Sequence, residues 1–161
     1  MKRALLPALL ALLAFSAGCD KEPTAPVDQG TFAATLDGAA WVGDAESDVA
    51  RDTFAIYSRR RTAGADEQWL TIRAVETSPG VFTVVTTATS GDPSHYSETV
   101  GGDVLTYRAV ATAGTITFQE LDRVRGVMRG TVSLTLQGPR GTSRLEEGTF
   151  EAGPWRRTNQ R

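Results

Sequence analysis

The stretch TFAATLDGAAWVG, residues 31–43, decides the fold class of this chain. Its apolar side chains Phe32, Ala34 and Leu36 alternate with others that are mostly polar, and this period of two predicts a strand with one buried face. The dipeptide Asp37-Gly38 follows, which favours a tight hairpin turn. Residues 39–43 would then return as the second strand of a β-hairpin.

The same alternation recurs along the chain, at residues 53–57, 70–74, 82–85, 105–109, 115–118 and 131–136, with a last candidate strand near 148–152. Threonine is abundant in these runs and suits a half-exposed pleated surface. Clusters of Gly, Pro, Asp and Ser separate the runs. About eight to ten strands with short connections predict an all-β, mainly antiparallel domain, which is either a β-sandwich or a flattened barrel.

Three segments depart from this pattern. Residues 45–52 would form at most one or two helical turns, and 91–98 are interpreted as a polar loop. The three arginines at 59–61 stand between two predicted strands and favour a solvated turn, the alternative being contact with lipid headgroups or glycan phosphates. Gly126 and Gly130 lie inside the long run 124–137 and indicate a bulge or bend.

The N-terminus has the anatomy of an export signal. Lys2 and Arg3 precede an apolar run at 4–15, which is too short to span a bilayer. Ser16-Ala17-Gly18-Cys19 follows and resembles the lipobox of bacterial lipoprotein signal peptides. That resemblance implies cleavage before Cys19 and diacylation of its thiol, which would hold the protein stably on a membrane outside the cytoplasm. Cys19 is the only cysteine, so the chain cannot form an internal disulfide.

The sequence therefore divides into four parts: a signal peptide at 1–18, a lipid-anchored flexible tether at 19–29, a single β domain at 30–152 and a frayed tail at 153–161. The signal carries two of the 17 basic residues and none of the 19 acidic ones, so the mature chain has a net formal charge of −4. No net positive field is present to hold a polyanion, which argues against nucleic acid as a partner.

Four short motifs suggest a family. The domain opens with Phe32-x-Ala34-x-Leu36-Asp37-Gly38-x-x-Trp41, continues with GTITF at 114–118 and GTVSL at 130–134, and ends with GTF at 148–150. This order resembles an uncharacterised family of small β-rich bacterial lipoproteins across nearly all of residues 30–152. The resemblance implies an envelope-anchored β domain, and it brings no activity and no catalytic residues.

His95 is the only histidine and therefore the only candidate base for a Ser-His-Asp hydrolase. Hydroxyl and carboxylate side chains are close to it in sequence, but no Gly-x-Ser-x-Gly elbow occurs, and a solvated loop histidine is the simpler interpretation. Glu146 and Glu147 are adjacent, so on a regular strand they would point to opposite faces and could not flank one glycosidic bond together.

Other residues have weaker functional interpretations. Asp44, Glu46, Asp48 and Asp52 could supply oxygens to calcium, but they lack the glycine and closing glutamate of an EF-hand and are interpreted as a solvated acidic loop. The three tryptophans are candidates for the lining of a sugar or lipid pocket, and partial burial is the alternative; they are Trp41, Trp69 and Trp155. No phosphate loop or dinucleotide fingerprint is present, and no cofactor or metal is expected.

These observations predict a lipid-anchored envelope protein whose β domain is a non-catalytic module that binds a partner protein, a glycan or an apolar ligand. Two alternatives remain at this point: an envelope hydrolase that uses His95, and a structural subunit of an envelope complex.

Overall fold

The computed structural model describes residues 30–61, 67–89 and 91–154. Within them the backbone forms nine β-strands and no helix, which confirms the all-β prediction. The strands are β1 (Gly30–Leu36), β2 (Ala39–Ala50), β3 (Thr53–Arg61), β4 (Glu67–Ser78), β5 (Val81–Val84), β6 (His95–Val100), β7 (Asp103–Asp122), β8 (Val127–Gly138) and β9 (Gly141–Pro154).

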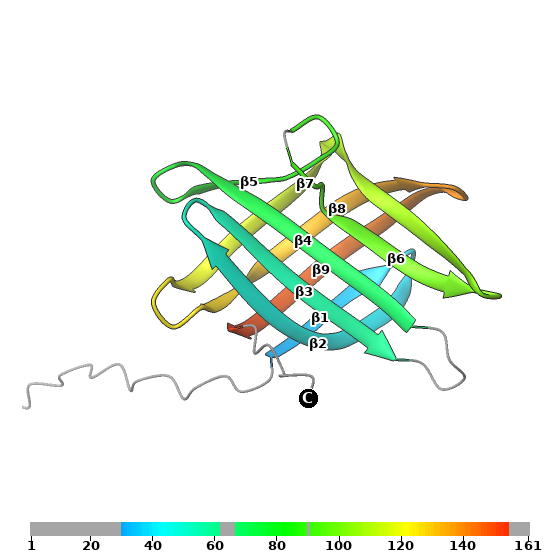
Figure 1. Ribbon diagram of the computed structural model, residues 1–161, viewed down its shortest axis with the longest axis horizontal. Coiled ribbons are helices and arrows are strands. Elements are labelled where there is room, and N and C mark those ends of the chain that lie inside the picture. The colour runs from blue at the N-terminus through cyan, green and yellow to red at the C-terminus, as the bar shows by residue number, and fades with distance from the viewer. Residues whose placement is uncertain (1–29, 62–66, 90, 155–161) are drawn as a thin grey trace, which may run out of the picture.

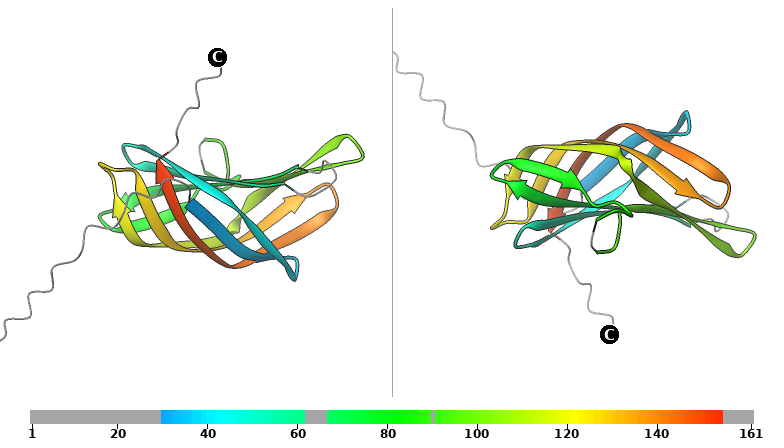
Figure 2. Two further views of the ribbon diagram at one scale, coloured as in Figure 1. Left: turned by 90° about the horizontal axis from the view of Figure 1, so that it is seen from below. Right: turned by 90° about the horizontal axis from the view of Figure 1, so that it is seen from above.

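The strand pairings close on themselves. The order β3-β2-β1-β9-β8-β7-β6-β4 is completed by an antiparallel pairing of β3 with β4, so eight strands form a ring. The ring is flattened into two layers that cross each other: β3, β4 and β6 lie in front of β1, β9 and β8 in Figure 1, and Figure 2 shows the narrow profile. The closed pairing gives a flattened barrel whose two layers pack as in a sandwich, and both forms agree with the prediction of a sandwich or a flattened barrel.

β5 and β6 together act as one interrupted strand. Both run antiparallel to β4, with Val84 opposite Ala74 and His95 opposite Thr71. The chain leaves the sheet between them, and the two ends of this excursion meet where the amide of Ser94 donates to the carbonyl of Val85 at 2.8 Å. The excursion therefore leaves the closure of the barrel intact.

The barrel interior holds one apolar cluster drawn from every strand. The apolar residues whose alternation predicted a strand lie in this cluster or pack against it, because successive side chains of a strand point to opposite faces. Leu70, Ile72 and Ala74 of β4 are all buried, and so are Val132, Leu134 and Leu136 of β8. Eight strands make a barrel that side chains of this size can fill.

The barrel has two different ends. At one end, which we call the closed end, the rings of Phe54, Phe82, Phe118 and Phe150 contact one another with centroids 4.6–5.7 Å apart. The hairpins β1–β2, β6–β7 and β8–β9 lie at the other end, the mouth, on the right of Figure 1. β1 starts and β9 finishes at the closed end.

Several local predictions were wrong. Residues 45–52 are not helical: β2 continues to Ala50, and a turn at 51–52 leads into β3. The arginines at 59–61 extend β3 rather than forming a turn, and His95 begins β6 instead of lying in a loop. The predicted strands at 105–109 and 115–118 are parts of one long strand, β7, whose pairing with β8 shifts between Ala109 and Gly114.

The glycines of the 124–137 run have different roles. Gly126 adopts a left-handed φ of 67° in the turn before β8, so it marks a turn and not a bulge inside a strand. Gly130 lies within β8 opposite Phe150, and the carbonyl oxygen of Thr117 together with the Phe150 ring occupies the space that a side chain would fill.

A β-bulge in β9 overturns the prediction for Glu146 and Glu147. The pairing with β8 runs from Gly148 opposite Val132 to Leu145 opposite Leu134, so two glutamates face the single residue Ser133. Glu147 has a φ of 53°, and both glutamate side chains are exposed. They therefore do not alternate across the sheet.

Candidate functional site

A polar cleft lies at the mouth of the barrel. We call it the mouth cleft and define it by the side chains of Trp41, Arg60, Gln68, Tyr96, Glu98 and Tyr107. These residues come from β2, β3, β4, β6 and β7, all near their mouth ends. The cleft has a volume of about 210 Å³ and is partly open to solvent.

Glu98 is the centre of the mouth cleft. Its Oε2 accepts a hydrogen bond from the hydroxyl of Tyr96 at 3.1 Å, and its Oε1 accepts one from the hydroxyl of Tyr107 at 3.4 Å. Tyr96 and Glu98 are two residues apart on β6 and therefore point to the same side, and Tyr107 is opposite Tyr96 on β7. The two phenols orient the carboxylate and take up one lone pair of each oxygen.

The two tyrosines are neutral donors at physiological pH. Burial raises the pKa of Tyr96 far above its usual value, and the charge of Glu98 adds to that effect. Burial also raises the pKa of Tyr107, again with Glu98 as the next cause. Each hydroxyl therefore keeps the proton that it donates to Glu98.

Trp41 and Gln68 form the second hydrogen-bonded pair of the cleft. The indole Nε1 of Trp41 donates to Oε1 of Gln68 at 3.0 Å. This bond fixes the orientation of the amide and leaves its NH2 group, with two donors, on the other side. The Trp41 ring itself is buried and packs edge-on against Phe32, with centroids 5.6 Å apart.

Charges of both signs line the cleft. The guanidinium of Arg60 donates to the carbonyl of Ala40 at 3.2 Å and so stays beside the cleft without pairing to Glu98. Asp37 stands at the rim, where its Oδ1 accepts from the amide of Arg144 at 2.7 Å. Two carboxylates and one guanidinium thus surround neutral amide and phenol groups.

The mouth cleft has the groups needed to hold a small polar molecule. Its residues offer hydrogen-bond donors and acceptors in fixed positions. The residues that line the cleft include no histidine and no cysteine, and Glu98 and Asp37 are its two carboxylates.

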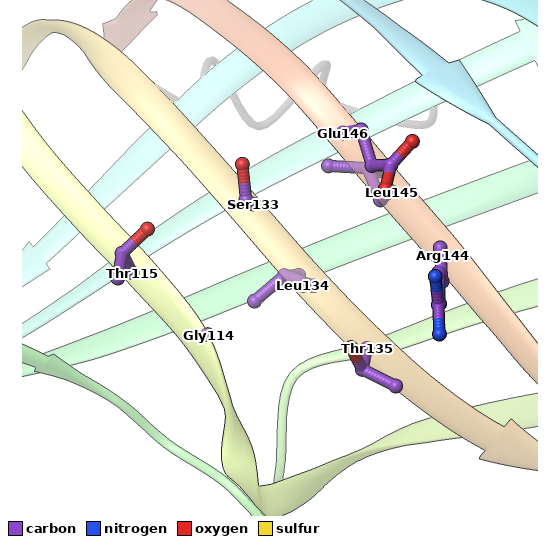
Figure 3. A pocket seen from close by; sticks show the side chains of 8 residues that line it. All are labelled: Gly114, Thr115, Ser133, Leu134, Thr135, Arg144, Leu145 and Glu146. Carbon is purple, nitrogen blue, oxygen red and sulfur yellow. The ribbon is translucent and has the colours of Figure 1, made fainter.

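A second, shallower depression of about 230 Å³ lies on the outer face of the barrel. Figure 3 shows that its lining comes from three neighbouring strands, β7, β8 and β9. Short polar side chains such as Thr115 and Ser133 dominate it, with Arg144 and Glu146 at one side. The lining residues include no aromatic ring, so this depression offers less to a ligand than the mouth cleft does.

His95 contacts a backbone carbonyl rather than a carboxylate. It is on β6, and its Nδ1 lies 3.0 Å from the carbonyl oxygen of Pro93. The nearby carboxylate of Asp92 pairs instead with Arg73, at 3.0 Å. In the part of the chain that the structure describes, no carboxylate hydrogen-bonds the imidazole, which is the contact that a Ser-His-Asp triad needs.

The acidic residues proposed for calcium lie on a strand. Asp44, Glu46 and Asp48 occupy alternate positions of β2, so the predicted acidic loop is wrong. Asp52 follows in the turn. Within residues 30–61, 67–89 and 91–154, no group of three or more Asp, Glu, His or Cys side chains is arranged to hold a metal ion.

The predicted tryptophan sites divide between the two faces of the sheet. Trp41 lies in the mouth cleft, whereas Trp69 lies on the outside of β4, 41% exposed, with the guanidinium of Arg59 over its ring at 5.3 Å. Trp155 and the lipidation candidate Cys19 fall outside the described residues.

Sequence reasoning missed Gln68, Tyr96 and Glu98 as functional candidates. A signal was present: Tyr96-x-Glu98 has strand spacing, and it pairs with the alternating run 105–109, in which Tyr107 falls on the apolar face. A carboxylate two residues from an inward tyrosine points into the barrel as well. The segment was interpreted as a loop because Asp92, Pro93 and Ser94 precede it.

No family model, curated protein or solved structure matches this chain. Among the described residues, no helix has the length and apolar character needed to cross a bilayer.

Proposed function

We propose that this chain is a lipid-anchored protein of a bacterial envelope whose β domain binds a small ligand, without transforming it, at the mouth cleft. The observation that carries the proposal is the pairing of Glu98 with two buried tyrosine hydroxyls beside the Trp41–Gln68 hydrogen bond. Polar groups held in fixed positions at the end of an otherwise apolar barrel interior are typical of ligand sites.

The anchor rests on the signal at 1–18 and on Cys19. Bacteria that express the full chain are grown with an alkyne analogue of palmitate. The mass of the purified protein is then measured by mass spectrometry. We expect loss of residues 1–18 and a diacylglyceryl group on Cys19. A Cys19→Ser variant should take up no label, and a wild-type protein with a free thiol would refute the anchor.

Binding at the cleft is tested separately with a mixed library of small molecules. The readout is the indole N–H resonance of Trp41 in the full chain, assigned with a Trp41→Phe variant. We expect at least one compound to shift this resonance and to lose the effect in Glu98→Gln. A library in which no compound moves the Trp41 resonance would refute the binding function.

A further inference from the structure

We infer that the mouth cleft takes a neutral, polyhydroxylated ring, such as the terminal sugar unit of a glycan. The inference rests on the proposed function and specifies the ligand class for the same site. It depends on the charges, the hydrogen-bonding groups and the size of the cleft.

The charges disfavour an ionic ligand. A cation drawn to Glu98 would meet the guanidinium of Arg60, which lines the same cleft and is held there by the Ala40 carbonyl. An anion drawn to Arg60 would meet the carboxylates of Glu98 and Asp37. Like charges at short range cost more in a partly desolvated cleft than in water, so a neutral molecule is favoured.

The hydrogen-bonding groups of the mouth cleft favour a ligand with several hydroxyls. Each oxygen of Glu98 retains an acceptor site after accepting one phenol, and each phenol oxygen retains one of its own. The carbonyl oxygen of Gln68 accepts the hydrogen bond from Trp41, and the NH2 group of the same amide can then offer its two donors to a ligand. A hydroxyl both donates and accepts, so a ring that carries several hydroxyls can satisfy both kinds of group at once.

An apolar ligand does not fit these groups. It would displace water from Glu98 and Gln68 and form no hydrogen bond with them, so each of these polar groups would be left unpaired at a cost in free energy. Charged groups cost more than neutral ones. The polar lining therefore selects against lipid tails and other hydrocarbons.

The size of the cleft sets how much of a glycan it can hold. A volume of about 210 Å³ corresponds to roughly seven water molecules at ~30 Å³ each, which is the space of one sugar ring. For a ring of about twelve non-hydrogen atoms we expect a dissociation constant on the order of 1 mM. The remainder of a longer glycan would lie in solvent.

The test follows the Trp41 indole resonance of the full chain in dodecylphosphocholine, a detergent without a sugar headgroup. The neutral probes are the methyl glycosides of glucose, galactose and mannose. Glucosamine serves as the cationic probe, glucuronate as the anionic probe and cyclohexanol as the apolar probe. The Trp69 resonance, from the outer face, is the internal control for non-specific effects.

We expect at least one methyl glycoside to shift the Trp41 resonance at millimolar concentration while the other probes leave it unchanged. The Glu98→Gln substitution should weaken the binding of that glycoside at least tenfold. Glu146→Gln is the matched control, because it is the same substitution at an exposed site on the outer face. Should Glu98→Gln fail to fold, Tyr107→Phe, which removes one hydroxyl and keeps the ring, should also weaken binding.

The outcomes separate the two proposals. A stronger shift from glucosamine, glucuronate or cyclohexanol than from any glycoside would overturn the sugar inference and leave ligand binding at the cleft in place. The same holds if every probe fails while a compound of the mixed library shifts Trp41. Equal weakening by Glu98→Gln and Glu146→Gln would also overturn the inference, because binding would then not depend on the cleft.

Discussion

The buried hydroxyl of Ser94 makes two hydrogen bonds with the main chain of Arg73: it accepts from the amide at 2.8 Å and donates to the carbonyl at 3.1 Å. These bonds replace a strand pairing at the point where the chain leaves the edge of β4 between β5 and β6. This side chain thereby joins the backbone hydrogen bonds from Ser94 to Val85 and from Val85 to Arg73 in keeping the barrel closed across the excursion.

Replacing Ser94 by alanine should lower the free energy of unfolding by about 1–3 kcal/mol, because the amide of Arg73 loses its partner in a buried position. Urea denaturation measures the change. Ser133→Ala, at an exposed position of β8, is the control and should stay within about 0.5 kcal/mol of wild type. Equal effects of the two substitutions would contradict the role given to Ser94.

Gly138→Ala should destabilise the barrel by roughly 1–3 kcal/mol through overpacking. A Cβ at this position would stand under 3.0 Å from three ring atoms of Tyr107, a residue of the mouth cleft. The double variant Gly138→Ala/Tyr107→Leu should recover part of the loss relative to the sum of the single changes, as a double-mutant cycle of thermal unfolding would show. Strict additivity would argue against this contact.

Stability should fall as the pH rises above 10. The pKa values of Tyr96 and Tyr107 are raised in the folded state, so in alkali the unfolded chain loses these protons first and unfolding is favoured. The stabilisation is complete below the unfolded value of about 10, and each tyrosine contributes a slope of up to about 1.4 kcal/mol per pH unit above it. Urea midpoints between pH 9 and about 11.5 measure the slope.

The variant Tyr96→Phe/Tyr107→Phe is the control for this alkaline loss, since it removes both phenols and keeps both rings. Its midpoint at neutral pH can differ from wild type because Glu98 loses two donors. The slope above pH 10 is therefore the relevant quantity. An undiminished slope in the double variant would assign the alkaline loss to other groups.

Phe54→Ala should cost about 3–5 kcal/mol of stability, the usual range for deleting a buried aromatic ring. The Phe54 ring packs against Phe82 and Phe118 at the closed end, and the guanidinium of Arg123 lies over it at 4.9 Å. Thermal unfolding compared with Val104→Ala, at an exposed site of β7, measures the effect. A loss below about 1 kcal/mol would mean that the closed end repacks around the gap.

The sequence predicted the strands whose inward residues are large and apolar. It failed for β2 beyond residue 43, where the inward residues Ala45 and Ser47 are small and the outward ones are acidic. When the inward residues are small, the alternation of apolar and polar residues that indicates a strand is harder to recognise. Ser47 is buried all the same, because its hydroxyl hydrogen-bonds the carbonyls of Gly126 and Gly153.

The site was harder to predict than the fold. An inward carboxylate such as Glu98 breaks the apolar alternation, and it is tolerated because it accepts hydrogen bonds from Tyr96 on its own strand and from Tyr107 on the neighbouring strand. The approach of Tyr107 depends on strand order, which alternation does not determine. Trp41 was identified as a candidate because tryptophan combines a large ring with one polar group.

The direction of β1 determines which end of the barrel a membrane anchor would join. This strand starts at Gly30 on the closed end and finishes at Leu36 beside the cleft, a span of roughly 23 Å. A lipid on Cys19 would be joined to the closed end through the tether, residues 19–29, which can span at most about 40 Å. An anchor there would leave the opening at the end of the barrel away from the point of attachment, so the tether itself would not cover it.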